Sequence, residues 1–221
     1  MFKFFMSPDK KEITSSVTHM IGAVLALLGT IRLLTMVDWN DKIYKPISII
    51  IFGVSMLVLY LSSATYHWID GTKERIKGIT QRIDHMAIFV LISGTYTPIC
   101  AIALAGKTIG IWLLCIVCAS SLLGFLMKIF WMNAPQWISC GLYVAMGWVS
   151  IFALPPLVSS LHFWGIFWLV SGGILYTAGS LIYGFEKPQI NLSWFGSHEL
   201  FHIFVMAGTF CHYITVSLLL I

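Results

Sequence analysis

The sequence predicts an all-α membrane protein, a bundle of seven transmembrane helices with the N-terminus in the cytoplasm and the C-terminus outside. Composition supports this class, because 58% of the 221 residues are hydrophobic and only 10% are charged. Soluble domains carry roughly 25% charged residues, and a chain this short must still cover a surface, so the bilayer is its natural solvent. The spacing of apolar runs then gives the number of helices.

Each predicted helix corresponds to one apolar run of roughly the 20 residues that a helix needs to cross the bilayer. The runs lie near 17–37, 46–67, 84–105, 109–130, 138–157, 161–183 and 198–220. Several ends carry tryptophans, whose amphipathic rings favour the membrane interface: Trp39, Trp68, Trp131, Trp137 and Trp194. The least marked boundaries lie at Lys107, after the third run, and at Pro155–Pro156, after the fifth.

The first run is predicted to stay in the mature protein as a span. It is longer than the roughly 7–15 residues of a signal-peptide core, and no small-residue cleavage motif follows it. No linker, repeat or low-complexity segment divides the chain, so we predict a single domain over residues 1–221.

The distribution of basic residues predicts the orientation. With the N-terminus in the cytoplasm, nine of the 13 basic residues face inside and four face outside. The inside set is Lys3, Lys10, Lys11, Lys73, Arg75, Lys77, Arg82, Lys128 and Lys187, and the outside set is Arg32, Lys42, Lys45 and Lys107. The positive-inside rule favours this arrangement, and it requires an odd number of spans. No basic run is long enough to suggest binding to nucleic acid.

Polar residues gather at one face of the predicted bundle. Spans one, three and seven start at the cytoplasmic face, and span two ends there. The residues brought to this face are Glu12, His19, Ser63, His67, Asp84, His85, His198, Glu199 and His202. Ionisable groups at membrane depth are costly and are functional candidates by default. The convergence therefore predicts a functional site in the cytoplasmic leaflet.

The pattern His-x-x-x-His at His198 and His202 predicts a metal site. Residues four apart share a face of a helix, so both imidazoles can bind one ion. Zinc suits them, and a catalytic zinc site typically has three protein ligands and a water. His67, at the same depth on another helix, is the best third ligand. Ser63 lies one turn before it, and Asp84 begins the next helix, where it could hold or deprotonate water at the metal.

The same residues support other interpretations. The segment from His198 to His202 also fits HExxH, the zincin signature, in which Glu199 would be the base of an intramembrane protease. No later segment clearly supplies a protease-type carboxylate ligand, so this interpretation ranks second. His19 fits a packing residue, and Ser63 with its small neighbours fits a surface where helices approach closely. Five glycines are interpreted as such close-approach positions: Gly94, Gly147, Gly172, Gly173 and Gly208. Imidazole also suits copper, iron and nickel.

Four sequence motifs occur here that are found together in one protein family. They are Glu-Ile-Thr-Ser-Ser-Val-Thr-His at 12–19 with Gly22, Ser-Ser-Ala-Thr-Tyr-His at 62–67, Arg-Ile-Asp-His at 82–85 with Gly-Thr-Tyr-Thr-Pro at 94–98, and the histidine pair of 198–202. In this order they resemble the hemolysin III family, a bacterial branch of the progestin and adiponectin receptor (PAQR) superfamily. The stretches run from end to end of the chain, and their combination is what makes the resemblance specific.

The resemblance implies a seven-helix fold with a cytoplasmic N-terminus. It implies zinc held by His67, His198 and His202, with Asp84 beside a zinc-bound water and Ser63 nearby. The wider superfamily includes alkaline ceramidases, which share a Ser, Asp and three-His constellation, and related receptors are thought to hydrolyse lipid amides. The chain is thereby a candidate zinc hydrolase acting on a membrane lipid.

Three functions are compatible with these residues. The first is a zinc-dependent hydrolase of a lipid amide or ester in membrane lipid homeostasis, with Ser63 as oxyanion donor. Either Asp84 or Glu199 would be its base, because Glu199 fills a position where receptor members carry Gln. The second is a non-catalytic receptor or regulator with structural zinc, and the third is a membrane-perturbing, haemolytic protein. A membrane lipid is the expected substrate or ligand, and the length suits a multi-pass protein of a bacterial inner membrane.

Overall fold

A computed structural model describes residues 9–190 and 192–221 of the protein, so that Lys3 of the charge analysis lies outside the described residues. Seven of the described helical segments are long and apolar enough to cross a membrane, which confirms the predicted fold class. The elements are α1 (Lys10–Met36), α2 (Tyr44–Trp68), α3 (Glu74–Pro98), the π-helix η2 (Ile99–Ala103), α4 (Thr108–Phe130), α5 (Gln136–Trp148), the 3-10 helix η3 (Val149–Ala153), α6 (Leu154–Ser160), α7 (Phe163–Phe185) and α8 (Ser197–Leu218).

Two helices begin earlier than hydropathy predicts. Helix α1 begins at Lys10 instead of near residue 17, and α3 begins at Glu74 instead of near residue 84. The carboxylate of Asp9 accepts a backbone N–H from the first turn of α1 at 2.8 Å, which is a typical N-cap. Polar first turns of this kind do not register as apolar runs, yet they carry residues of the site described below.

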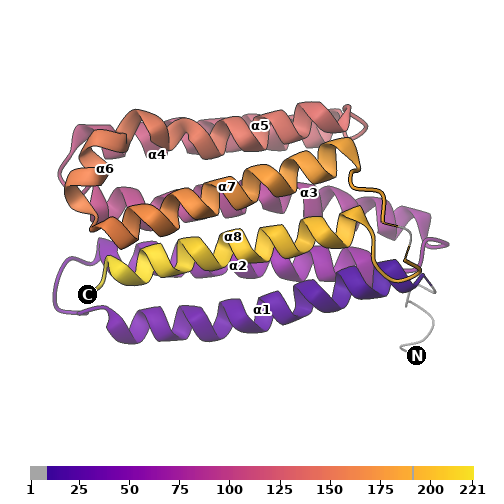
Figure 1. Ribbon diagram of the computed structural model, residues 1–221, viewed down its shortest axis with the longest axis horizontal. Coiled ribbons are helices and arrows are strands. Elements are labelled where there is room, and N and C mark those ends of the chain that lie inside the picture. Colours follow the sequence, from indigo (N-terminus) through magenta and orange to yellow (C-terminus); the bar gives the residue numbers. More distant parts are fainter. Residues whose placement is uncertain (1–8, 191) are drawn as a thin grey trace.

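The helices run side by side along the long axis of the molecule (Figure 1). Helix α1 packs on α2 and α8, α2 on α3, α3 on α4, and α7 on both α5 and α8. We call the end of the bundle where α1, α3, α5 and α8 begin the site end; the C-terminus lies at the opposite end (Figure 1).

Asp70 closes the short turn between α2 and α3. Its carboxylate accepts the backbone N–H of Thr72 at 2.8 Å. Because this bond favours the ionised form, it lowers the pKa of the Asp70 carboxyl. The turn returns the chain so that the last turn of α2 and the first turns of α3 both lie at the site end.

Two hydrophobic cores hold the bundle together. One lies among α1, α2, α3 and α8 and includes the fully buried Phe52. The other lies among α3, α4, α5 and α7 and includes the fully buried Phe89. Because lipid tails are as apolar as these side chains, close packing and not removal from water is what stabilises the two cores in a membrane. A cavity of about 530 Å³ has members of both cores in its wall, so the bundle is not filled along its middle.

The fifth predicted span is a broken helix. The hydroxyl of Tyr96 on α3 shares its one proton between the carbonyls of Met146 at 2.9 Å and Gly147 at 2.7 Å, and accepts the N–H of Ser150 at 3.1 Å. In an α-helix that N–H would bond to the Met146 carbonyl. The side chain therefore replaces a backbone bond, and α5 passes through η3 before α6 resumes with prolines in its first turn.

The glycines divide into two groups. A Cβ atom at Gly94 would lie 2.3 Å from Cβ of Ser55, and Gly172 and Gly208 are similarly close to aromatic or histidine rings, as the small-residue interpretation predicts. A Cβ atom at Gly147 or Gly173 would meet nothing within 4 Å, so the interpretation is wrong for these two positions. A local sequence does not reveal which face of a helix is crowded.

Candidate metal centre

Three histidines from two helices meet at the site end. His67 lies in the last turn of α2, and His198 and His202 lie one turn apart at the start of α8. The Nε2 atoms of His67 and His198 are 3.1 Å apart. One ligand nitrogen from each ring can be chosen so that all three lie within 4.8 Å of one another. The structure thus brings together the three histidines that the sequence singles out.

The donor set fits one divalent metal ion. Two imidazole nitrogens on a tetrahedral zinc, each at about 2.0–2.1 Å, lie roughly 3.3–3.4 Å apart. The separation of 3.1 Å between the first two nitrogens is close to that value. His67 and His202 are 3% and 1% exposed, so their rings are held in place by packing. Three imidazole nitrogens in a shielded position suit zinc and the other metals that imidazole binds.

An acid orients the first of these histidines. Glu12 on α1 places Oε2 at 3.2 Å from Nδ1 of His67, on the side of the ring away from His198. The same oxygen accepts a hydrogen bond from Nζ of Lys77 at 2.6 Å. A carboxylate on Nδ1 fixes the ring and leaves Nε2 as the ligand nitrogen, an arrangement common around metal sites.

His202 is positioned by α1. Its ring stacks on that of His19 with centroids 3.6 Å apart and planes at 7°. Its Nδ1 lies 3.5 Å from the hydroxyl of Thr18. His19 is 2% exposed, and its ring nitrogens have no hydrogen-bond partner among the described residues. The structure therefore places His19 against the centre as a stacking partner of His202.

Asp84 and Ser63 line the cavity beside the histidines. Asp84 is 8% exposed and Ser63 is 1% exposed, and both belong to the cavity wall together with His198 and His202. An acid, a hydroxyl and two imidazoles therefore face the same enclosed space.

The carboxylate of Glu199 makes hydrogen bonds that hold helices together. Its Oε1 accepts the hydroxyl of Ser15 at 2.7 Å, and its Oε2 accepts the backbone N–H of Gly196 at 2.7 Å. These bonds cap the start of α8 and attach it to α1. Among the described residues that line the cavity, Asp84 is present and Glu199 is not. Of the two candidate bases, Asp84 is the one with access to the cavity.

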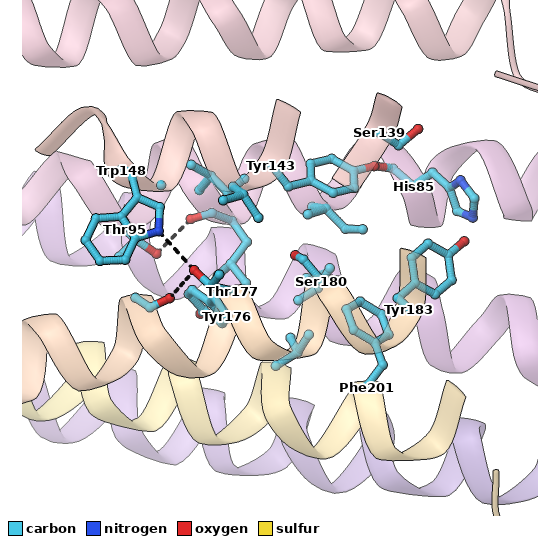
Figure 2. Close-up of a pocket in the computed structure, with 18 of the residues that line it drawn as sticks. His85, Thr95, Ser139, Tyr143, Trp148, Tyr176, Thr177, Ser180, Tyr183 and Phe201 are labelled. Carbon is cyan, nitrogen blue, oxygen red and sulfur yellow. Dashed lines mark hydrogen bonds between the residues drawn. The ribbon is translucent and has the colours of Figure 1, made fainter. Parts of the chain in front are cut away.

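The cavity extends from this site along the bundle. Figure 2 shows Ser139, His85 and Tyr183 towards one end and Trp148, Thr177 and Tyr176 towards the other. The carbonyl of His85 accepts the Tyr143 hydroxyl at 3.2 Å, and its ring faces Tyr183 with centroids 6.5 Å apart. His85 thus lines the cavity but stands apart from the three-histidine group.

Sequence reasoning did not single out Lys77. It appeared only as one of the inside charges, although its ammonium pairs with Glu12 and also donates to the Tyr66 carbonyl at 2.9 Å. The available signal was Glu12 itself, because a carboxylate at this depth needs a cationic partner. A lysine in the first turn of the neighbouring α3 supplies it.

Fold and site together define a class of protein. It is an α-helical, multi-pass membrane protein with a three-histidine group buried at one end of a seven-helix bundle, beside an internal cavity. The motifs that form the group come from both ends of the chain, so a relative that shares them should match over nearly its whole length.

Comparisons with known proteins agree with this class. The sequence matches the family described as Haemolysin-III related over residues 9–213, and the chain belongs to that family. It is 40% identical over 200 residues to the "Hemolysin-3 homolog" of Bacillus subtilis (strain 168), with 90% of each chain covered. It is 35% identical to the "Hemolysin-3" of Bacillus cereus, with 90% of this chain and 87% of that protein covered.

A more distant similarity reaches eukaryotes. The "ADIPOR-like receptor IZH2" of Saccharomyces cerevisiae is 24% identical over 240 residues, which cover 95% of this chain and 70% of that protein. With its seven spans and its Bacillus relatives, the chain is a multi-pass integral protein of the bacterial plasma membrane.

Proposed function

We propose that this protein is a zinc-dependent hydrolase that cleaves an amide or ester bond of a membrane lipid. One observation carries the proposal: the three-histidine group, an acid and a hydroxyl share one end of a long, mostly apolar cavity inside the bundle. When bound, zinc supplies a Lewis acid and lowers the pKa of a water ligand to about 7. The cavity offers an acyl chain a mostly apolar environment.

The protein's own residues divide the remaining tasks. His67, His198 and His202 hold the metal, and Glu12 fixes the ring of the first through Nδ1. Asp84, which lines the cavity, accepts a proton from the attacking water and returns it to the leaving nitrogen or oxygen as the carbonyl carbon loses that bond.

Ser63 and the cavity wall complete the scheme. The Ser63 hydroxyl donates a hydrogen bond to the carbonyl oxygen as negative charge develops on it. Apolar residues such as Leu169 and Leu157 enclose the far part of the cavity and exclude water from the acyl chain. Glu199 keeps α8 attached to α1 and does not take part in proton transfer.

A regulator with structural zinc is the second candidate. It is favoured by the placement of the ligands, because His67 on α2 and the histidines of α8 would be tied by one ion. Relatives bear the name of a haemolysin, and a lytic role would be a third function. Neither the regulator nor the lytic protein needs Asp84 and Ser63 to face the cavity, whereas a hydrolase uses both residues.

The deciding experiment measures metal content and turnover on the same preparations. Full-length protein is purified in detergent without chelator, and zinc is counted by mass spectrometry in the wild type, His67→Ala and the double variant His198→Ala/His202→Ala. We expect about one zinc per chain in the wild type and none in either variant. His162→Ala, an exposed histidine at the start of α7, is the matched control and should keep its zinc.

Turnover of lipid amides and esters then separates catalysis from regulation. In Asp84→Asn we expect zinc content to stay and hydrolysis to fall about 10²–10⁴-fold, because the proton acceptor is lost. Glu199→Gln should retain hydrolysis. Full zinc with no hydrolysis in the wild type would favour the regulator, and absence of stoichiometric zinc would refute both.

A further inference from the structure

Lys128 is a buried cation that the scheme above does not use. It lies in the last turn of α4, at the site end, and is 2% exposed. Its neighbours Ile129 and Phe130 are 47% and 83% exposed, so this turn of α4 does present a face to the membrane. Lysines near helix ends ordinarily extend along that face to the headgroup region. Lys128 is instead turned into the bundle.

The ammonium of Lys128 has a neutral hydrogen-bond partner. Its Nζ donates to the hydroxyl of Ser139 on α5 at 2.7 Å. Within residues 9–190 and 192–221, Lys128 is not a member of any of the ion pairs that the structure gives. A buried charge without a counter-ion is costly, and a bound anion would remove much of that cost.

Lys128 belongs to the wall of the same cavity as the metal centre. Ser139, its partner, also lines the cavity and lies towards the end that holds His85 and Tyr183 (Figure 2). Asn133 and Gln136, in and after the turn between α4 and α5, line the cavity and are exposed, so the cavity reaches the surface there. The amide groups of these two residues are hydrogen-bond donors.

Different helices line two sides of this end of the cavity. On one side, Asp84 on α3 and Ser63 on α2 line it together with His198 and His202 of α8. Lys128 on α4 interacts with Ser139 of α5. A ligand that spans the cavity mouth can place its reacting carbonyl at the first side and a negatively charged group at the second.

We propose that Lys128, with Ser139, Asn133 and Gln136, forms a subsite for the phosphate of a lipid headgroup. Lysine binds phosphate as a point charge, and the amides and hydroxyl add donors around the same oxygens. The subsite lies where the cavity opens at the membrane surface, which is the depth of lipid phosphates, while the apolar remainder suits the acyl chain. The inference deepens the proposed function, on which it rests for the acyl bond, by naming phosphate-bearing lipids as its substrate class.

Native mass spectrometry of the full-length protein in neutral detergent tests the subsite directly. The probes are dioleoyl phosphatidic acid, dioleoylglycerol, which has the same chains without phosphate, and inorganic phosphate. We expect Lys128→Met to weaken binding of phosphatidic acid about tenfold, the effect of losing one charged hydrogen bond, and to leave dioleoylglycerol unchanged. Lys128→Arg should keep most of the affinity, and inorganic phosphate should bind weakly to every variant.

Lys42→Met, which removes an exposed lysine from the turn between α1 and α2, is the matched control and should behave as the wild type. Equal affinity of the wild type and Lys128→Met for phosphatidic acid would overturn the inference. An equal loss of affinity for phosphatidic acid and dioleoylglycerol in Lys128→Met would also overturn it. So would binding of inorganic phosphate that depends on Lys128 when binding of phosphatidic acid does not.

The assay also keeps this inference separate from the proposed hydrolase. Lipid binding is repeated in His67→Ala, where Lys128-dependent discrimination of phosphatidic acid should persist without metal. If the wild type neither holds zinc nor hydrolyses lipid but still prefers phosphatidic acid to dioleoylglycerol through Lys128, the subsite is supported and the hydrolase is refuted. If it hydrolyses lipid without this preference, the hydrolase is supported and the subsite is refuted.

Discussion

Glu12 and Glu199 lie near the same histidines, yet their carboxylates have different partners. Glu12 meets His67 at 3.2 Å and Lys77 at 2.6 Å, whereas Glu199 accepts the Ser15 hydroxyl and a backbone N–H at the start of α8. That both acids lie at one end could be predicted, because depth follows from position along a helix. Their partners could not, because these depend on how α1 is rotated against α2 and α8.

Glu12→Gln is expected to lower zinc affinity about 10–100-fold, the usual effect of removing a carboxylate that orients a histidine ligand. The amide holds Nδ1 of His67 less strongly and leaves Lys77 without its counter-charge. Competition with a chromophoric zinc chelator measures the change. Glu74→Gln, an exposed acid in the first turn of α3, is the control. Wild-type affinity in Glu12→Gln would remove this residue from the site.

At the scale of elements, the broken helix of the fifth span is a feature that local sequence does not predict. Apolar runs predicted the span 138–157 because hydropathy is a property of a single segment. The change from α5 to η3 at Val149 depends on the hydroxyl of Tyr96, which comes from α3, some 50 residues earlier in the chain. Pro155 and Pro156 marked a boundary in the right region, and they lie in the first turn of α6, just after the break.

Tyr96→Phe is expected to destabilise the bundle by about 1–3 kcal/mol, because the carbonyls of Met146 and Gly147 and the N–H of Ser150 lose a buried partner. Thermal unfolding in detergent, followed by circular dichroism, measures the loss as a lower midpoint. Tyr44→Phe, at the exposed start of α2, should leave the midpoint unchanged. An unchanged midpoint in Tyr96→Phe would mean that η3 forms without this hydroxyl.

For the whole molecule, the seven spans and the convergence of the histidines followed from counting, since each crossing reverses the face at which a helix begins. The cavity did not follow. It is the space that two separate cores leave between them, so no single segment encodes it. The side of α4 on which Lys128 lies is set by the same packing.

Gly173→Leu tests whether the cavity length selects the substrate. Gly173 lines the cavity, and a Cβ there meets nothing within 4 Å, so a larger side chain can enter the space without a clash. The position lies roughly 18 Å from the end of α7 at the site end. We expect turnover of long-chain lipids to fall several-fold relative to short-chain ones.

Competition assays with a series of acyl lengths measure this preference. Gly141→Leu, on the exposed side of α5 with no atoms close to its Cβ, is the control. An unchanged preference in Gly173→Leu would show that the acyl chain does not reach this depth.

The placement of the histidines also determines when, during synthesis of the chain, the metal centre can form. His67 and His198 are separated by 131 residues, and the second lies on α8, which follows the other six spans along the chain. During synthesis, six spans can insert and pack before any ligand arrives from α8. The centre is therefore absent from a chain that stops before α8 and can form only once α8 has been made and inserted. Metal capture would act as a closing step in biogenesis, drawing α8 onto α2.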